Sequence, residues 1–275
     1  MLNLLIYVDG SSASQAALEY IAPITRDADV ATTILTAQSD PARGVELFGR
    51  AASRLRAAMV RHVNRVEAGD TALINEAQTG AYDLAVFGPL RERWSRWLRM
   101  RPSSTLSAQL PISSLLVRGQ ARQISRMLIC AGGDRTVIAD ARLAARLARR
   151  TGASATILHV LSQIPMIFGV RTPQERLLEA FEATGAPEVA NMRAAAEVLA
   201  QSGVAAELKL RIGLVIDEIV AELRAGGYDL LVVGAHRSQT LIERLLLEDV
   251  TRDILGQSPV PVLVVKERPA TPPNG

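Results

Sequence analysis

The stretch "LLIYVDGSSASQAALEYIA" at residues 4–22 returns near the middle of the chain as "MLICAGGDRTVIADARLAA" at residues 127–145. Each stretch is an apolar run, then a turn that contains glycine, then a segment whose apolar residues recur three and four positions apart. The apolar run is typical of a buried strand, and the last segment is typical of an amphipathic helix. The chain therefore carries two copies of one strand–turn–helix unit.

The repeat continues beyond this unit, with one change of spacing. Residues 31–38 match residues 154–161 at the spacing of the first unit, whereas "GAYDLAVFG" at 80–88 matches "GGYDLLVVG" at 226–234 at a longer spacing. The longer spacing indicates that the second copy has extra residues between its second and third strands. We assign them to residues 163–191.

Each copy is predicted to alternate five strands with four helices. The strands are rich in Val, Ile and Leu without polar alternation, which is typical of parallel strands buried on both faces. The sequence predicts an α/β fold of two tandem doubly wound parallel-sheet domains, Rossmann-like and adenine nucleotide alpha hydrolase-like. The first copy covers residues 1–120 and the second residues 121–270, followed by a frayed tail at 271–275. Within the insertion we expect a helix at 172–185, near the mouth of the second copy's crevice.

Composition narrows the function further. The chain has 275 residues, a net charge of +3, three histidines and one cysteine, Cys130. No apolar run is long enough for a membrane span, and a cytoplasmic protein is expected. A disulfide within the chain is excluded, no metal cluster is expected, and Cys130 is interpreted as a buried strand thiol. The excess positive charge is concentrated at residues 91–101, so no specific nucleic-acid binding is predicted.

The ligand crevice of an open parallel sheet lies beyond the carboxyl ends of the strands, where the strand order reverses. That point falls after the first and fourth strands of each copy. In the first copy the informative turns are residues 8–12 and 87–93. In the second copy they are residues 131–136 and 233–239.

On these turns the chain resembles a tandem universal stress protein. The resemblance depends on "VDGS" after the first strand, "YDLLVVG" (228–234), "EDVTRDILGQSPVPVLVV" (248–265) and the duplication itself. In the ATP-binding branch of that family, an Asp after the first strand meets the adenosine. A Gly-x-x-Gly loop with a later Gly-Ser or Gly-Thr pair holds the phosphates. Other branches lack this motif and do not bind ATP.

The match to that motif is partial. The second phosphate-loop glycine is replaced by Arg91 in the first copy and by Arg237 in the second, and Glu248 and Asp249 stand where the second copy's later Gly-Ser pair would be. The resemblance gives this set of candidate nucleotide-binding residues: Asp9, Gly10, Ser11, Ala37, Gly88, Arg91, Arg93, Gly132, Gly133, His159, Gly234, His236, Arg237 and Thr251.

The replacements matter because such a loop binds phosphate through converging main-chain N–H groups, which requires residues that adopt positive φ. An arginine forced into the left-handed region costs about 1–2 kcal/mol, and two carboxylates repel a triphosphate. The second copy is therefore not expected to bind ATP. In the first copy, Arg91 and Arg93 either grip phosphate through their side chains or form a solvated face.

Both tryptophans of the chain, Trp94 and Trp97, lie within the basic segment. Tryptophan and arginine are enriched at interface hot spots, so we expect these two residues to anchor a homodimer. The alternative is that they cap the protein's own core. A further protein partner is possible, whereas the apolar face of the segment is too short to hold a membrane.

The histidines are weaker signals. His62 is expected on an exposed strand face and His236 in the loop beside Arg237. His159 closes the second strand of the second copy, where it either contacts a ligand or is a plain strand-end residue. No catalytic triad or carboxylate pair is found, so an enzyme is not predicted, and weak ATP hydrolysis is the least favoured hypothesis.

Two function classes remain. The first is a stress-response regulatory protein with a degenerate adenine-nucleotide or anion site, mainly in the first copy. ATP or another adenine nucleotide is its possible ligand, and no cofactor is required. The second is a ligand-free interaction or scaffolding module.

Overall fold

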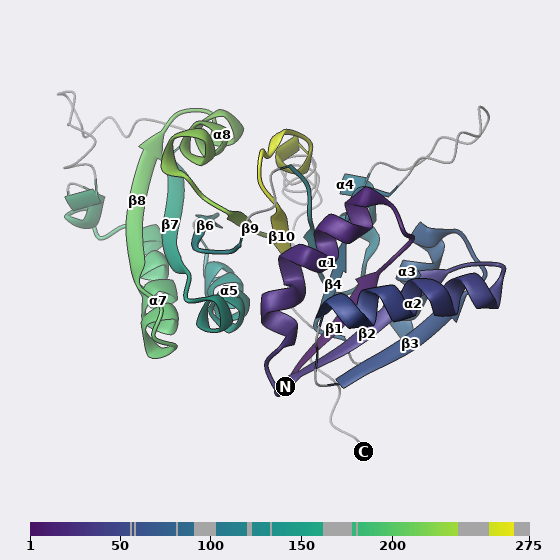
Figure 1. Cartoon of the computed structure of the whole chain (residues 1–275). Helices are drawn as coiled ribbons and strands as arrows, with labels where there is room; N and C mark the ends of the chain where they lie inside the picture. Colours follow the sequence, from purple (N-terminus) through teal and green to yellow (C-terminus); the bar gives the residue numbers. More distant parts are fainter. Residues whose placement is uncertain are drawn as a thin grey trace, which may run out of the picture.

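The computed structural model describes residues 1–55, 57, 59–80, 82–90, 103–119, 123–132, 134–161, 178–179, 181–235 and 253–266. Their ten strands form one sheet in the order β3-β2-β1-β4-β5-β10-β9-β6-β7-β8 (Figure 1). The first copy lies on the right of that view and the second on the left. The two copies are thus halves of one sheet.

The first copy alternates strands and helices throughout. Its elements are β1 (Leu2–Tyr7), α1 (Ser12–Thr25), β2 (Val30–Ala37), α2 (Pro41–Leu55), β3 (Met59–Arg65), α3 (Gly69–Thr79), β4 (Leu84–Phe87), α4 (Ser103–Gln109) and β5 (Ser113–Leu116). The second copy repeats them as β6 (Arg126–Ala131), α5 (Val137–Thr151), β7 (Ser154–Leu161), α7 (Pro187–Gln201), β8 (Ala206–Ile212), α8 (Val215–Gly226), β9 (Leu230–Gly234), a helix at residues 253–257, and β10 (Val262–Val265).

Within each copy all neighbouring strands are parallel, and the chain winds outward in both directions from its first strand, which lies between the second and the fourth. The predicted α/β doubly wound class is confirmed, and so is the reversal of strand order beside β1 and β6. The copies join where β5 pairs antiparallel with β10, and Leu115 lies opposite Leu263. Because this one junction is antiparallel, the carboxyl edges of the two copies face opposite ways.

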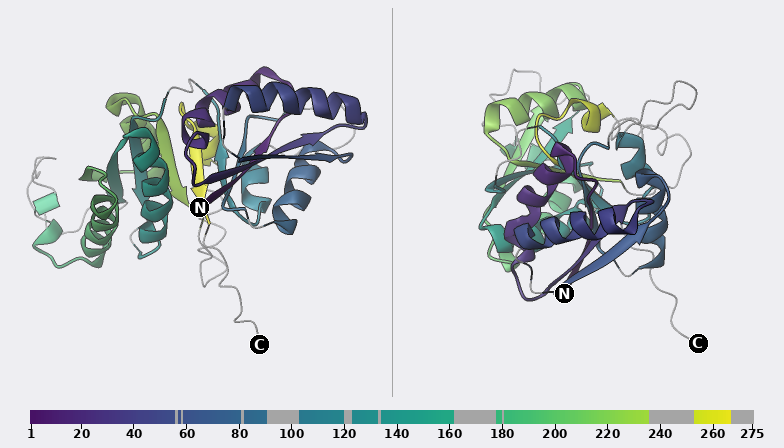
Figure 2. Two further views of the ribbon diagram at one scale, coloured as in Figure 1. Left: turned by 60° about the horizontal axis from the view of Figure 1, so that its bottom comes forward. Right: turned by 45° about the vertical axis from the view of Figure 1, so that its right-hand side comes forward.

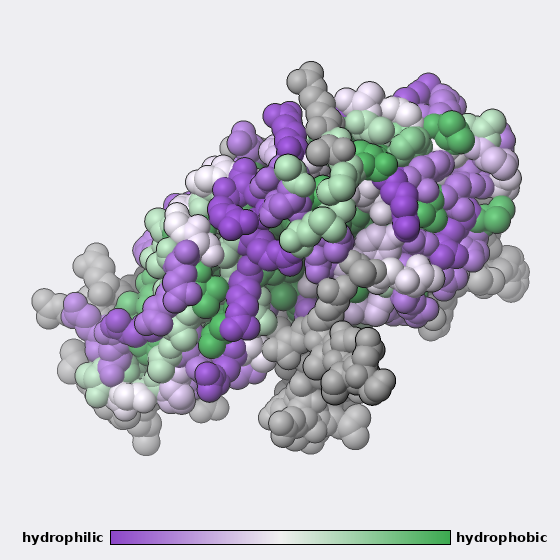
Figure 3. Space-filling model, turned by 90° about the horizontal axis from the view of Figure 1, so that it is seen from below, coloured by the Kyte–Doolittle hydropathy of each residue, from purple (hydrophilic) through white to green (hydrophobic). Residues whose placement is uncertain are grey.

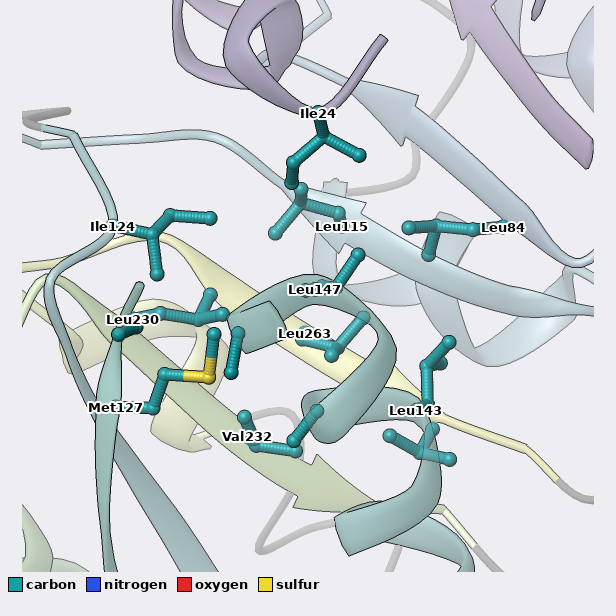
Figure 4. Packing of buried hydrophobic residues seen from close by; sticks show 14 of the residues in the cluster. Ile24, Leu84, Leu115, Ile124, Met127, Leu143, Leu147, Leu230, Val232 and Leu263 are labelled. Carbon is teal, nitrogen blue, oxygen red and sulfur yellow. The ribbon is translucent and has the colours of Figure 1, made fainter. Parts of the chain in front are cut away.

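Helices cover both faces of the sheet (Figure 2). One core lies under α1, α2, α5 and α7, and the other under α3, α4 and α8. The first core is continuous across the junction: Ile24 of α1 and Leu147 of α5 lie with Leu115 and Leu263 in one packed group (Figure 4). One apolar core therefore runs across the join between the copies.

The second copy's insertion lies between β7 and α7. Because α7 corresponds to α2 of the first copy, residues 187–191, which we had assigned to the insertion, belong to the repeat itself. Part of the predicted helix at 172–185 is seen: residues 178–179 and 181–182 are helical, and Phe181 is buried in the core. Gly185 follows at φ 70°. Residues 162–177 and 180 lie outside the described residues.

No helix in the described part of the chain combines the length and the apolar character that crossing a membrane requires.

Candidate functional site at the carboxyl edge of the first copy

Three connections of the first copy come together at one edge of the sheet. Ile6 of β1 lies opposite Val86 of β4 and Ile34 of β2. The residues that follow these strands, Asp9 and Gly88 among them, are therefore placed at the same edge. This is the switch point at which doubly wound sheets bind ligands.

The turn after β1 is built by its own polar side chains. Asp9 Oδ1 accepts a hydrogen bond from the main-chain N–H of Ser11 at 2.8 Å. Ser11 Oγ caps α1 by accepting from Ser14 N at 3.1 Å, and Gly10 between them takes φ 80°. Such a turn suits an Asp-Gly-Ser sequence, because Asp closes the turn, Gly supplies the positive φ and Ser caps the helix. Asp9 is half-buried, and among the described residues its second oxygen has no hydrogen-bond partner.

Gly88 touches the start of α1. A Cβ at this position would come within 2.4 Å of the carbonyl oxygen of Ala13, so no larger residue fits. The loop after β4 therefore begins directly against the first turn of α1, where the helix dipole favours an anion. This close approach gives Gly88 a structural reason to be glycine that is independent of any ligand.

The outer side of the turn faces arginines of α2. A small hollow of about 30 Å³ lies between Gly10, Leu47, Arg43 and neighbouring residues of α1 and α2. Glu46 pairs with Arg43 and with Arg50, each at 2.5 Å. Sequence reasoning missed these arginines, although their spacing along one helix face could have shown them.

Ala37 ends β2 beside a polar cluster. Thr36 Oγ1 lies 2.9 Å from His62 Nε2 and 2.8 Å from Asn64 Oδ1. His62 is half-buried rather than exposed as predicted, because its ring stacks on Phe48 of α2 at 4.6 Å between centroids. Burial lowers the pKa of His62. Ala37 is thus placed at the edge, while its neighbours hold β2 to β3.

The second copy arranges the same edge differently. Gly132 stands at the position of Asp9, and the carboxylate is displaced by two residues to Asp134. Asp134 Oδ1 accepts from Thr136 N at 3.1 Å and from the Thr136 hydroxyl, just before α5 begins. The protein's own carboxylate therefore lies where the helix dipole would otherwise attract an anion.

His159 and Cys130 both belong to the second copy's sheet. His159 lies within β7 rather than at its end, is 8% exposed, and donates from Nδ1 to the carbonyl of Ala131 at 2.8 Å. The imidazole ring of His159 is therefore hydrogen-bonded within the sheet and does not lie in an open crevice. Cys130 lies on β6 as predicted and is half-buried; burial raises the pKa of its thiol, and the charge of Asp140 raises it further.

The family now follows from comparison with known proteins. A model of the universal stress protein family matches residues 124–266, which is more than half of the chain. The chain belongs to the universal stress protein family. A search of curated proteins found no match.

Solved structures extend the universal stress protein fold over both copies. A universal stress protein from Archaeoglobus fulgidus DSM 4304 is 16% identical, with 96% of each chain covered and a TM-score of 0.66. A functionally unknown protein from Pseudomonas aeruginosa PAO1 is 14% identical over 97% of this chain and 92% of its own, at a TM-score of 0.63. A putative universal stress protein from Pseudomonas aeruginosa UCBPP-PA14 is 14% identical over 97% and 93%, at 0.61. These likenesses show a shared fold over nearly the whole length.

Several predicted site residues lie outside the described residues. They are Arg91, Arg93, Gly133, His236, Arg237 and Thr251, together with Trp94 and Trp97. Of the remaining candidates, the structure brings Asp9, Gly10, Ser11, Ala37 and Gly88 to the first copy's carboxyl edge, and Gly132 and Gly234 to that of the second. Within the described part of this universal stress protein, no three His, Cys, Asp or Glu side chains gather as metal ligands would.

Proposed function

We propose that this universal stress protein is a non-catalytic stress-response regulator that binds an adenine nucleotide at the carboxyl edge of its first copy. The observation that carries the proposal is Asp9. Ser11 N fixes one carboxylate oxygen of Asp9, and the other has no partner among the described residues. A carboxylate held in this way is ready to accept a hydrogen bond from a ribose hydroxyl or an adenine amine.

The difference between the copies supports assigning the site to the first one. In the second copy, glycine replaces Asp9, and Asp134 lies next to the start of α5. A phosphate there would meet a like charge where the first copy offers the neutral cap of Ser11. ATP is the nucleotide to test first, because Asp9 keeps the position at which the ATP-binding branch of the family meets the adenosine, although the match to the rest of that branch's motif is partial.

The alternative is a ligand-free interaction module. The observation that favours it is the size of the hollow beside Gly10, about 30 Å³, whereas ligand pockets usually measure about 300 Å³ or more. This comparison covers the described residues only, and residues 91–102 are not among them.

Calorimetric titration of ATP into the full-length protein distinguishes the nucleotide-binding regulator from the ligand-free interaction module. Asp9→Asn should weaken binding about tenfold or more, because hydrogen bonds to a charged group are worth about 1.5–3 kcal/mol. Asp134→Asn is a matched control, since both side chains accept from the main-chain N–H two residues ahead. Equal losses in both variants would refute the first-copy site. No ATP binding by the unmodified protein would favour the ligand-free module.

Association is a separate proposal. The β5 edge is already paired with β10, so a second chain cannot add there, and a homodimer must use another surface. The basic segment with Trp94 and Trp97 is our proposed anchor. Replacing both with Ala should shift the protein toward monomer in sedimentation at micromolar concentration, since each anchor is worth about 2 kcal/mol. An unchanged mass with a lower melting temperature would instead assign Trp94 and Trp97 to the protein's own core.

A cytoplasmic location stays a prediction.

A further inference from the structure

The junction between the copies has two sides that the repeat makes equivalent. An approximate two-fold axis passes where Leu115 lies opposite Leu263, because these two residues occupy the same position of the repeat. On one side α1 meets the second copy, and on the other α5 meets the first. The 123-residue spacing of the first unit places Leu143 where α1 has Tyr20.

On the α1 side the contact is filled by an aromatic ring. Tyr20 is 4% exposed, and its hydroxyl donates to the main-chain oxygen of Asp229 at 2.7 Å. Tyr20 comes from the first copy and Asp229 from the second, so this side chain spans the junction.

On the α5 side the equivalent space is open. Leu143 lacks the ring and the hydroxyl, and a pocket of about 390 Å³ lies beside it. Its walls come from both copies: α5 and Lys266 from the second, and Asp83 and Ile112 from the first. Asp83 is the repeat equivalent of Asp229, so the pocket lies where Tyr20 lies on the other side.

The open side also carries more positive charge. Arg142, Arg146 and Lys266 line the pocket against one carboxylate, Asp83. The equivalent positions on the filled side are Glu19, Pro23 and Arg118.

Among the described residues, two of these three cations are bonded to other groups of the protein, and the third is not. Arg146 pairs with Asp83 at 3.4 Å and donates to the Met1 carbonyl at 2.7 Å. Lys266 Nζ donates to the carbonyls of Ala108 and Leu110 at 2.7 and 2.6 Å. Arg142 is exposed and makes no ion pair with any described residue. Seen from below, hydrophilic residues cover much of the described surface, with apolar residues between them (Figure 3).

We propose that this junction pocket binds a small organic anion with a planar ring, such as an aromatic carboxylate. The repeat argues for the ring, because an aromatic side chain fills the equivalent space. Leu143 and Ile112 offer apolar walls to its faces, and the excess of cations argues for the negative charge. A bound molecule would contact both copies and stabilise their junction. This pocket lies at the amino ends of β4 and β5, apart from the nucleotide site proposed at Asp9.

Calorimetric titration of the full-length protein with 4-hydroxybenzoate, and with the neutral 4-hydroxybenzamide, tests the pocket. We expect a Kd below about 1 mM for the acid and binding about tenfold weaker for the amide. Arg142→Gln should weaken binding of the acid about tenfold. Glu19→Gln changes one charge at the equivalent position of the filled side and should leave binding unchanged. Leu143→Tyr copies the filled side into the pocket and should abolish binding.

Three results would overturn the proposal: no binding of the acid up to about 10 mM, equal binding of acid and amide, or equal effects of Arg142→Gln and Glu19→Gln. If Leu143→Tyr does not fold, the arginine variant and the choice between acid and amide still decide the outcome. A melting temperature that rises with 4-hydroxybenzoate in the unmodified protein but not in Arg142→Gln would add independent support.

Discussion

The two copies share a buried polar triad and differ at their edges. In the first copy Glu76 accepts from Tyr82 at 2.7 Å and from Arg65 at 2.8 Å. In the second copy the equivalent three residues are Glu222, which accepts from Tyr228 at 2.8 Å and from Arg211 at 3.0 Å. Glu222 also accepts from Lys209 at 2.9 Å, a contact that the first copy does not have. The turn after the first strand and the junction contact have both changed. The duplication thus retained the interactions that fix the third helix to the sheet, while positions at the proposed nucleotide site and at the junction between the copies diverged.

The largest expected effect comes from breaking that shared triad. Glu222 is 2% exposed, and Glu222→Gln should destabilise the protein by about 3 kcal/mol, because it leaves Lys209 without a charge partner and Arg211 with Glu218 alone. Glu76→Gln should cost slightly less, since Glu76 has one close cation and a second, Arg61, at 3.5 Å. Urea denaturation measures both. Glu207→Gln, at a 64% exposed side chain, is the control and should change stability by less than about 0.5 kcal/mol.

The same triad predicts a pH dependence. Burial by itself raises the pKa of Glu222, but hydrogen bonds from Lys209, Tyr228 and Arg211 outweigh burial and hold that pKa below its ordinary value. A lowered carboxyl pKa stabilises the fold above the unfolded value of about 4.3, and this contribution is lost as the pH falls through the folded value. The stability gap between the unmodified protein and Glu222→Gln should therefore narrow below about pH 4. A gap that widens there would contradict the assignment.

A smaller effect is expected from making the two sides of the junction alike. Tyr20→Leu removes the hydrogen bond to Asp229 and opens a cavity, at a cost of about 2 kcal/mol by thermal melting. Tyr20→Phe removes only the hydroxyl and should cost about 1 kcal/mol. The cavity left by Tyr20→Leu lacks the arginines of the α5 side and should not bind 4-hydroxybenzoate. Equal stability of both variants would mean that the ring of Tyr20 contributes little.

At the candidate site, Gly88→Ala should cost about 1–2 kcal/mol, because the new Cβ would press on the main chain of Ala13. Gly132→Ala, in the second copy's edge, has nothing within 4 Å of its Cβ and should be neutral. Differential scanning calorimetry compares the two. If neither substitution changes the melting temperature, the loop after β4 can shift to accommodate a Cβ at little cost and does not hold α1 in place.

The smallest effect concerns two reciprocal contacts across the junction. Lys266 of the second copy donates to carbonyls at the end of α4, and Arg118 of the first donates to the Leu255 carbonyl at the end of the helix at 253–257. A cation at a helix carboxyl end contributes about 0.3–1 kcal/mol. Lys266→Met and Arg118→Met should each lower stability by that amount, less at high salt. A salt-independent loss would indicate packing of the aliphatic stem instead.

Most of the fold could be predicted from the sequence, because apolar runs and their spacing report local periodicity and the repeat. The boundary of the insertion was harder, since the start of α7 resembles the inserted residues in composition. The join of β5 to β10 depends on contacts between residues far apart in the chain, which periodicity does not encode. The burial of His159 and the half-burial of His62 likewise depend on which helix covers each strand. Gly88 is a site candidate on the family resemblance alone, and its contact with Ala13 is a tertiary contact that the sequence pattern does not report.

The antiparallel pairing of β5 with β10 also bears on how the chain is made. During synthesis, β5 leaves the ribosome long before its partner β10, because β10 is the last of the ten described strands in the chain. Until then the apolar edge of Ser113–Leu116 has unpaired main-chain groups and is open to other nascent chains. We expect the interval before β10 emerges to be the period of greatest aggregation risk. Proteins that end before residue 262 should accumulate as aggregates during expression.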